Sequence, residues 1–256
     1  MYLVCCVPVT PLRAEAAHRS EMVSQVLFGE AVEVLEELRD KWVRIRCLYD
    51  NYEGWARMSE FTEIPEQVAR CESHMSAGWE NEISFNQQVM RIPFGCDLRA
   101  LQNGHAEWGK YSWSFKGDHL DPRYTRPNEK NIRKYSHLYL NTPYLWGGRS
   151  VFGVDCSGFV QVIFRSMGIA LLRDASQQAT QGEAIGFLQE AVCGDLAFFD
   201  NDEGRITHVG ILLNDHEIIH SSGKVRIDKI DNQGIINTDT GERTHKLRIL
   251  KRMVQP

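Results

Sequence analysis

A cysteine with the surroundings of a nucleophile lies at position 156, where a glycine-punctuated loop gives way to a helical pattern. The apolar positions that follow it are Phe159, Val160, Ile163, Phe164 and Met167, which mark one face of a helix. Asp155 is a good N-cap residue, so Cys156 would lie in the first helical turn. Free backbone N–H groups and the helix dipole favour a thiolate there. We therefore predict that Cys156 is a nucleophile rather than a small apolar core residue.

Two histidines are candidates for the base that a cysteine nucleophile needs. The chain has nine histidines, and only His208 and His220 lie within or at the end of an apolar, strand-like run. An imidazole in such a place must find a polar partner or cost stability. The other seven, His245 among them, lie in polar or turn-like contexts, and we expect them to be solvated or locally hydrogen-bonded.

The loop between the two apolar runs, around residues 214–216, decides what His220 can do. A loop with an odd number of residues puts His208 and His220 on the same face of the hairpin, where they can form a hydrogen bond. His208 would then be the base, and His220 would hold its tautomer. An even loop puts them on opposite faces, and His220 then merely ends a strand.

The first half of the chain has the pattern of short strands separated by polar turns. Four strands are predicted at 23–30, 31–36, 42–46 and 53–57, after a first strand at the N-terminus. This pattern is typical of a small barrel or sandwich. Residues 63–80 are predicted to be a helical or irregular connector. Residues 81–122 show a second, weaker set of strands, including 88–92 and 111–115.

The pattern changes after Pro122. A helix is predicted over 128–141, followed by the loop and the helix of Cys156, and then by strands at 194–199, 207–213, 217–220 and 246–250. Helices followed by a run of strands predict an α+β fold with one antiparallel sheet. We predict three domains, at 1–62, 63–125 and 126–256.

Composition excludes several classes of protein. The net charge of −5, with both signs interspersed, lacks the basic footprint of a nucleic-acid-binding protein. No run approaches the ~20 apolar residues that span a bilayer, and the N-terminus lacks a basic signal region. We expect a cytoplasmic protein, or an exported one if a leader has been removed. The seven cysteines show no metal-ligand spacing, so we expect reduced thiols, no metal and no cofactor.

Five ordered segments resemble the motifs of the NlpC/P60 cysteine peptidases. They are Pro143-Tyr-Leu-Trp-Gly-Gly, Val154-Asp-Cys-Ser-Gly-Phe-Val, Gly194-Asp-Leu-Ala-Phe-Phe, His208-Val-Gly-Ile and Ile219-His220. The resemblance covers about residues 128–254 and implies a papain-like catalytic domain. It also implies that Cys156 is the nucleophile, His208 the base and His220 the third residue. Tyr144 resembles the tyrosine of this family that lies near the scissile carbonyl and helps to hold the oxyanion.

The N-terminal segments resemble bacterial SH3 domains, and the whole layout is similar to γ-D-glutamyl-L-diamino acid endopeptidases. This resemblance implies two SH3-like barrels before the catalytic domain. It implies as substrate a murein tripeptide or tetrapeptide with a free N-terminal L-Ala, from which L-Ala-γ-D-Glu is released. The first barrel would read the substrate amine. The implied substrate-binding residues are Glu21, Tyr52, Asp155, Ser157, Asp174 and Ser176. Ala175 replaces a serine of the subgroup, so the sequence leaves open whether one hydrogen bond to the substrate is made.

Two other functions stay open at this point. An endopeptidase acting on intact peptidoglycan would keep the same three catalytic residues and use its SH3-like domains to bind the cell wall. A non-catalytic protein that binds cell-wall peptides would need none of them. We expect a monomer, and the sequence leaves the choice between diaminopimelate and lysine open.

Overall fold

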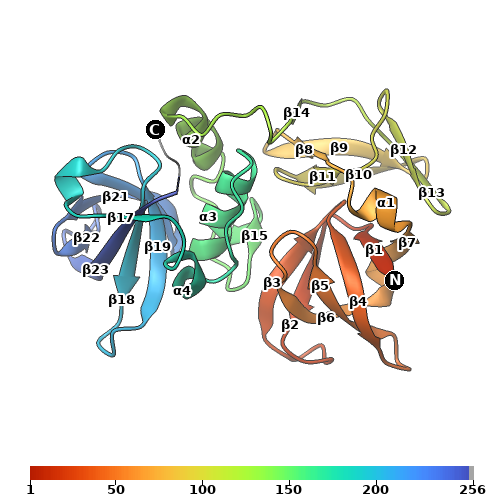
Figure 1. The fold of residues 1–256 in the computed structure, drawn as a ribbon, viewed down its shortest axis with the longest axis horizontal. Coiled ribbons are helices and arrows are strands. Elements are labelled where there is room, and N and C mark those ends of the chain that lie inside the picture. Colours follow the sequence, from red (N-terminus) through yellow and green to blue (C-terminus); the bar gives the residue numbers. More distant parts are fainter. Residues whose placement is uncertain (254–256) are drawn as a thin grey trace. The chain divides into compact units, whose positions relative to one another are not determined.

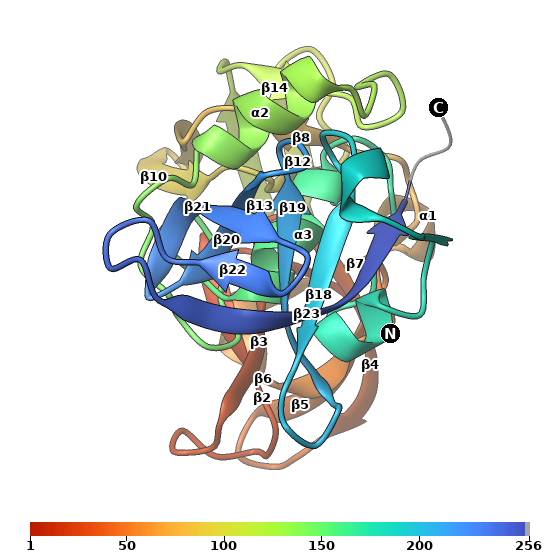
Figure 2. The ribbon, with the colours of Figure 1, turned by 90° about the vertical axis from the view of Figure 1, so that its left-hand side faces the viewer.

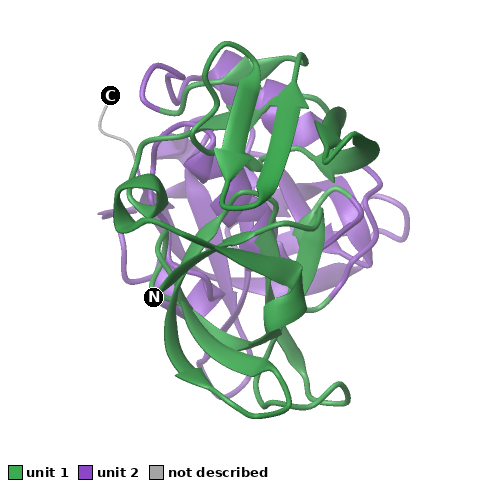
Figure 3. Cartoon of the chain, turned by 90° about the vertical axis from the view of Figure 1, so that its right-hand side faces the viewer, with its two compact units in different colours: residues 1–122, 146–151 green, residues 123–145, 152–256 purple. Residues whose placement is uncertain are grey.

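The computed structural model describes residues 1–253, which form two compact units (Figure 3). Unit 1 comprises residues 1–122 and the short segment 146–151, and unit 2 comprises residues 123–145 and those from 152 onward. The segment 146–151 therefore folds with unit 1, although it lies between Tyr144 and Cys156 in the sequence. No helix among residues 1–253 is long and apolar enough to cross a membrane.

Unit 1 begins with a curved, seven-stranded antiparallel sheet in the order β3-β2-β6-β5-β4-β1-β7 (Figure 1). Its elements are β1 (Tyr2–Cys5), β2 (Val9–Arg13), β3 (Met22–Leu27), β4 (Ala31–Glu37), β5 (Trp42–Cys47), β6 (Glu53–Arg57), η1 (Met58–Glu60) and β7 (Phe61–Ile64). The N-terminal strand and the four predicted strands between 23 and 57 are confirmed. The sequence analysis missed β2, which contains Pro11, because proline argues against a strand. The structure tolerates Pro11 because β2 pairs with β6 only at Arg13.

The rest of unit 1 packs against the first sheet through a shared hydrophobic cluster. Its elements are α1 (Glu66–Ala69), β8 (His74–Ser76), β9 (Glu80–Phe85), β10 (Gln88–Pro93), β11 (Asp97–Leu98), β12 (His105–Trp108), β13 (Tyr111–Phe115), β14 (His119–Leu120) and β15 (Arg149–Ser150). They include a four-stranded sheet, β10-β9-β13-β12, and a three-stranded sheet, β11-β8-β14. Phe28 of the first part packs against Trp108 and Trp113 of the second, with ring centroids 5.0 and 5.4 Å away. The two parts thus share one hydrophobic cluster, and the first sheet also encloses a separate cluster of its own.

Unit 2 combines short helices with one antiparallel sheet (Figure 2). Its elements are α2 (Glu129–His137), β16 (Gly153–Val154), α3 (Cys156–Arg165), α4 (Ala175–Gln178), β17 (Glu183–Ile185), η2 (Leu188–Glu190), β18 (Leu196–Asp200), β19 (Ile206–Leu212), β20 (Glu217–Ser222), β21 (Lys224–Asp231), β22 (Gly234–Ile236) and β23 (Arg243–Arg252). The strand order is β17-β23-β18-β19-β20-β21-β22, and β22 also pairs with β23, so the sheet closes on itself. The α+β class and the two predicted helices are confirmed, whereas β21 and β22 were not predicted.

One face of this closed sheet changes from apolar to polar along its strands. The apolar part is a buried cluster that includes Leu212, Ile218, Ile230 and Ile235. Side chains two residues apart lie on the same face of a strand. The same face therefore continues from this cluster to four polar residues, His208, His220, Asp228 and His245, of which the last pairs with Ile235 across the sheet. The apolar part fixes the register, and the polar part can carry chemistry.

Candidate active site

The cysteine singled out by the sequence is the first residue of α3. The Asp155 side chain accepts a 2.6 Å hydrogen bond from the Gly158 N–H, which confirms the predicted N-cap. Cys156 is buried, and its sulfur lies within hydrogen-bond reach of the Val209 N–H on β19. Val209 directly follows His208, so the helix end and the candidate base meet at this strand.

The surroundings of Cys156 favour the protonated thiol. Burial and the neighbouring Asp155 raise the pKa of Cys156 to about 12. The N–H groups of Val209 and Ser157 oppose this shift, and so does the guanidinium of Arg173. The helix end thus favours the thiolate as predicted, but burial and Asp155 outweigh it. The proton has to be taken by a base.

His208 and His220 lie on the same face of the β19–β20 hairpin. Leu212 pairs with Ile218, and the Leu213 N–H donates to the Glu217 carbonyl, so the loop is residues 214–216 and has odd length. The register brings His208 Nε2 within 2.8 Å of His220 Nδ1, and both side chains are buried. Of the two arrangements that the sequence left open, the structure has the one in which the two rings form a hydrogen bond.

Two other aromatic rings contact the His208 ring. The His245 ring stacks on it with a centroid distance of 4.1 Å and an angle of 26° between the planes, and the Phe199 ring lies 5.7 Å away. The expected local hydrogen bond of His245 is present, with its Nδ1 2.8 Å from the Thr244 hydroxyl, but the sequence did not indicate that its ring also stacks on His208. Burial lowers the pKa of His208 well below its ordinary value and that of His245 to about 4. Both rings are neutral at neutral pH, as a proton acceptor must be.

Sequence reasoning missed the next two residues in this chain of contacts. His220 Nε2 lies 3.0 Å from Asp228 Oδ2, and Arg226 Nε lies 2.8 Å from the same oxygen. Both residues are on β21, whose alternation of charged and apolar residues after the Ser222-Gly223 turn is a strand signal. That signal could have placed Asp228 on the same face as His220.

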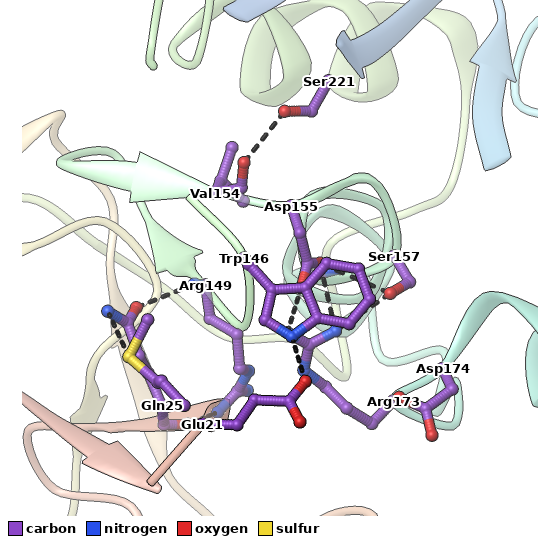
Figure 4. Close-up of polar contacts among 12 residues, drawn as sticks. Glu21, Gln25, Trp146, Arg149, Val154, Asp155, Ser157, Arg173, Asp174 and Ser221 are labelled. Carbon is purple, nitrogen blue, oxygen red and sulfur yellow. Dashed lines mark hydrogen bonds and ion pairs between the residues drawn. The ribbon is translucent and has the colours of Figure 1, made fainter. Parts of the chain in front are cut away.

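The loop that precedes the nucleophile is bound to the β20–β21 turn. The Tyr144 N–H donates to the Gly223 carbonyl at 2.9 Å, and the Ser221 hydroxyl donates to the Val154 carbonyl at 2.9 Å (Figure 4). Burial, with smaller contributions from Cys156 and Asp155, raises the pKa of Tyr144 to about 12. Tyr144 thus keeps its phenol proton and can donate a hydrogen bond.

A buried arginine that sequence reasoning also missed organises the start of α3. Arg173 is 1% exposed, and its Nη2 donates to Asp155 Oδ2 at 2.6 Å (Figure 4). Its Nη1 donates to the Ser157 hydroxyl at 2.9 Å, and Gln178 Nε2 donates to the Ser157 carbonyl at 3.1 Å. Asp155 and Ser157, two predicted substrate-binding residues, are thus brought together in one buried network.

Asp174 and Ser176, the other two predicted substrate-binding residues of unit 2, lie at the start of α4. Asp174 is the N-cap of α4, and its N–H donates to the Gln177 side chain at 3.1 Å. Ser176 is exposed in the first turn. Both residues thus lie at the start of the short helix that directly follows Arg173 in the sequence.

In unit 1, Glu21 follows the turn before β3 and accepts a 2.6 Å hydrogen bond from the Trp146 indole (Figure 4). Trp146 can approach because Gly147 has φ +75°, and a Cβ there would lie 2.5 Å from the Met22 carbonyl oxygen. Tyr52, predicted to bind substrate, packs against the core of the first sheet.

A buried ion pair anchors the same segment. Arg149 forms hydrogen bonds of 2.8 and 3.0 Å with the Glu30 carboxylate, and its backbone N–H donates to the Gln25 side chain. The sequence analysis assigned no role to Arg149, because nothing in the motif shows that this loop folds with the first sheet.

Among residues 1–253, the ring nitrogens of His208, His220 and His245 lie within 4.8 Å of one another, as a metal site requires. A shared ion needs in-plane lone pairs that converge on one point. Here His208 and His220 share a hydrogen bond, and His245 is stacked face to face on His208. The arrangement therefore suits the transfer and holding of a proton better than the binding of a metal.

A thiol at a helix N-terminus beside a hydrogen-bonded pair of buried histidines defines a site of the cysteine-peptidase kind. Residues 141–244 match the sequence profile of the NlpC/P60 family, and residues 12–60 match that of the bacterial dipeptidyl-peptidase SH3 domain. A γ-D-glutamyl-L-lysine dipeptidyl-peptidase from Bacillus subtilis is 30% identical over 221 residues, which cover 77% of this chain and 71% of that protein.

A second γ-D-glutamyl-L-lysine dipeptidyl-peptidase, from Bacillus cereus, is 27% identical over 88% of this chain and 76% of that protein. The crystal structure of an NlpC/P60 family protein from Bacillus cereus ATCC 10987 superposes with a TM-score of 0.82, covers both chains fully and is 20% identical. The chain belongs to the NlpC/P60 family and is a cysteine peptidase.

Proposed function

We propose that this peptidase hydrolyses the bond between γ-D-Glu and the diamino acid of peptidoglycan peptides that carry a free N-terminal L-Ala. The released product is L-Ala-γ-D-Glu, and the proposed setting is the cytoplasmic recycling of cell-wall peptides. The observation that carries the proposal is the hydrogen bond between His208 and His220. It lies next to the nucleophile, because the Cys156 sulfur is within hydrogen-bond reach of Val209, the residue after His208. The names of the two relatives support the substrate class.

In the proposed mechanism Cys156 is the nucleophile and His208 the base. His208 Nδ1 takes the thiol proton while the sulfur attacks the γ-carbonyl carbon of D-Glu. The C–N bond then breaks, and His208 returns the proton to the leaving amine of the diamino acid. Water next attacks the thioester and gives a proton to His208, which passes it back to the sulfur as the carboxylic acid leaves. His220 holds His208 through the 2.8 Å hydrogen bond.

The negative charge of the tetrahedral intermediates needs hydrogen-bond donors. We assign this role to the Tyr144 hydroxyl and the Cys156 backbone N–H. The raised pKa of Tyr144 supports the assignment, because only the protonated phenol donates. The anionic intermediate would repel an ionised tyrosine.

A buried substrate ammonium needs carboxylate partners. We assign amine recognition to Glu21 and Asp174, and contacts with the peptide to Tyr52 and Ser176. Asp155 and Ser157 are paired with Arg173, so their contribution is to shape the start of α3 and present backbone groups to the substrate.

The test is mass spectrometry of the products from L-Ala-γ-D-Glu-meso-diaminopimelate, its L-lysine counterpart and the N-acetylated forms. We expect cleavage of the free-amine peptides only, and none by Cys156→Ala. Cleavage of intact peptidoglycan, or of free and acetylated peptides at equal rates, would favour the endopeptidase function instead. No cleavage of any peptide by folded enzyme would contradict the proposal and favour a peptide-binding protein.

A further inference from the structure

The histidine pair continues into a buried carboxylate. His208, His220 and Asp228 form a chain in which Nε2 of His208 meets Nδ1 of His220 at 2.8 Å, and Nε2 of His220 meets Asp228 Oδ2 at 3.0 Å. The side chains of His220 and Asp228 are 1% and 2% exposed. Water therefore does not compete for these hydrogen bonds, and each nitrogen has a single partner along the chain.

Asp228 is held as an ionised acceptor. Its Oδ1 accepts from the Thr238 N–H at 2.8 Å and from Arg226 Nη2 at 2.9 Å, and its Oδ2 lies 2.8 Å from Arg226 Nε. Burial alone would raise the pKa of Asp228, but hydrogen bonds from His220, Arg226 and Thr238 hold it well below its ordinary value. An ionised carboxylate only accepts hydrogen bonds, so His220 must present its proton at Nε2.

That one constraint sets the protonation of both rings. A neutral imidazole carries one N–H, so a proton at Nε2 of His220 leaves Nδ1 as an acceptor. His208 Nε2 must then be the donor in the 2.8 Å hydrogen bond, which leaves Nδ1 of His208 with its lone pair. Nδ1 is the nitrogen that the proposed mechanism needs as the base.

We propose that Asp228 is a positioning residue that fixes the tautomers of His220 and His208, so that the site is a chain of four residues, Cys156, His208, His220 and Asp228. This inference rests on the proposed role of His208 as the base. When His208 is protonated during the reaction, Asp228 also stabilises the positive charge shared by the two rings. Its action is electrostatic and tautomeric, because it touches neither the substrate nor the sulfur.

The other charged groups around Asp228 do not replace it. Arg226 lies within 3 Å of both oxygens of Asp228, and its Nη2 is also 3.0 Å from the exposed carboxylate of Asp239. The ring centroid of His245 lies 5.7 Å from that of His220, and burial, which lowers the pKa of His245, keeps the His245 ring neutral. The carboxylate of Asp228 is therefore the acceptor that determines where the His220 proton lies.

Asp228→Asn is the informative substitution, because it keeps the shape of the side chain and replaces the acceptor that faces His220 with a donor. The Oδ1 position receives two donors, one of them the backbone N–H of Thr238, so the amide oxygen will take that position. The NH₂ group then occupies the Oδ2 position and donates to His220 Nε2. This forces the proton of His220 to Nδ1 and that of His208 to its own Nδ1, so the base is lost. An asparagine that forces the wrong tautomer in a Ser-His-Asp triad costs about 10⁴-fold in rate.

The chain offers a matched control in Asp231, on the same strand. Asp231 binds Arg243 through two hydrogen bonds of 2.6 and 2.7 Å, but it is exposed and meets no histidine. Asp231→Asn removes the same charge from β21 while leaving the histidine chain intact.

The experiment measures the rate at which iodoacetamide alkylates Cys156, followed by peptide mass spectrometry from pH 6 to 10, with peptide cleavage measured in parallel. For Asp228→Asn we expect both rates to fall about 100-fold at pH 7 and to recover as pH rises, because hydroxide then removes the thiol proton. Asp231→Asn should stay within twofold of the unchanged enzyme. Rates for Asp228→Asn within threefold of the unchanged enzyme at pH 7 would overturn the proposal, as would a loss that is independent of pH.

Two further points keep this inference testable apart from the proposed function and from a failure of the variant to fold. Alkylation needs no substrate, so it tests Asp228 even if the peptides named above are not cleaved. If Asp228→Asn does not fold, ¹⁵N NMR of the imidazoles in the unchanged enzyme replaces it. We expect His220 to be protonated at Nε2 and His208 at Nε2 at neutral pH, and a proton on Nδ1 of either neutral ring overturns the proposal.

Discussion

In unit 2, the buried residues Asp155 and Asp228 each form an ion pair with an arginine, but their other contacts differ. Asp155 is bound to Arg173, the Ser157 hydroxyl and the Gly158 N–H, so it fixes the start of α3. Asp228 is bound to Arg226 in the same way, but one of its oxygens faces a histidine. The first carboxylate shapes the fold around the nucleophile, and the second faces a group that can exchange protons. A buried ion pair therefore indicates a chemical role only when a titratable third group completes it.

The largest effect is expected at the end of the histidine chain nearest the nucleophile. His208→Gln should lower kcat/KM by about 10⁴-fold, because no base remains for the Cys156 thiol. Thermal stability should stay within a few degrees, because burial of a neutral imidazole contributes little charge interaction. Peptide cleavage and a thermal melt measured on the same preparation check both statements. Activity within tenfold of the unchanged enzyme would assign the base elsewhere.

Arg173→Met should lower the stability of unit 2. The substitution leaves Asp155 buried without its cation, and removing one partner of a buried pair costs about 3–5 kcal/mol. Urea unfolding monitored by circular dichroism measures this free energy. Arg205→Met is the control, because Arg205 and its partner Glu203 are both exposed and lie 3.0 Å apart, so its loss should change the free energy of unfolding by less than about 1 kcal/mol. Equal effects of the two variants would contradict the structural role of Arg173.

Stability should depend on pH through the buried histidines. The native state disfavours the charged form of His245, whose pKa is lowered to about 4, so the unfolded chain binds more protons between pH 6.5 and 4. The free energy of unfolding should therefore fall as pH drops through this window, by about 2 kcal/mol for His245 once solvent screening is allowed for, and should level off below it.

His245→Phe keeps a ring stacked on His208 and removes the titrating group. It should flatten this pH dependence, although His208, whose pKa is also lowered, keeps part of it. His216→Phe, in the exposed turn of the β19–β20 hairpin, is the control and should leave the slope unchanged. A slope that is the same in all three proteins would show that His245 is charged in the folded state.

The smallest effect should come from the residues proposed to recognise the amine. Glu21→Gln removes one carboxylate that is exposed to water, so KM for the free-amine peptide should rise about tenfold with kcat unchanged. Asp174→Asn should have an effect of similar size. Steady-state kinetics on the free peptide test this, and Glu15→Gln, at another exposed carboxylate before β3, should be neutral. A fall in kcat without a change in KM would place Glu21 outside substrate binding.

Much of the scaffold could be predicted from the sequence because its signals are local. The helix over Cys156–Arg165 follows from apolar spacing and an aspartate cap, and four of the strands in unit 1 follow from alternation between polar turns. The hydrogen bond between His208 and His220 could be stated as one of two alternatives, because the parity of a hairpin loop depends on only a few residues.

Other features of the site depend on residues far apart in the sequence. Arg149 is buried against Glu30, which is 119 residues away, and the stack of His245 on His208 joins β23 to β19. The local strand pattern could indicate the face on which Asp228 lies, but its hydrogen bond with His220 needed the exact register of β20 with β21. The thiol pKa also depended on how deeply Cys156 is buried, and the sequence pattern does not state that depth.

The sequence by itself determined the chemistry that is available: a thiol at a helix start, two histidines in apolar strands and an α+β order of elements. Only the tertiary structure decided which groups share protons, because a hydrogen bond requires two polar atoms within about 3 Å, and the registers of β19 with β20 and of β20 with β21 set that distance. It also decided that the resting thiol is neutral, since desolvation arises from all the residues that pack around the sulfur.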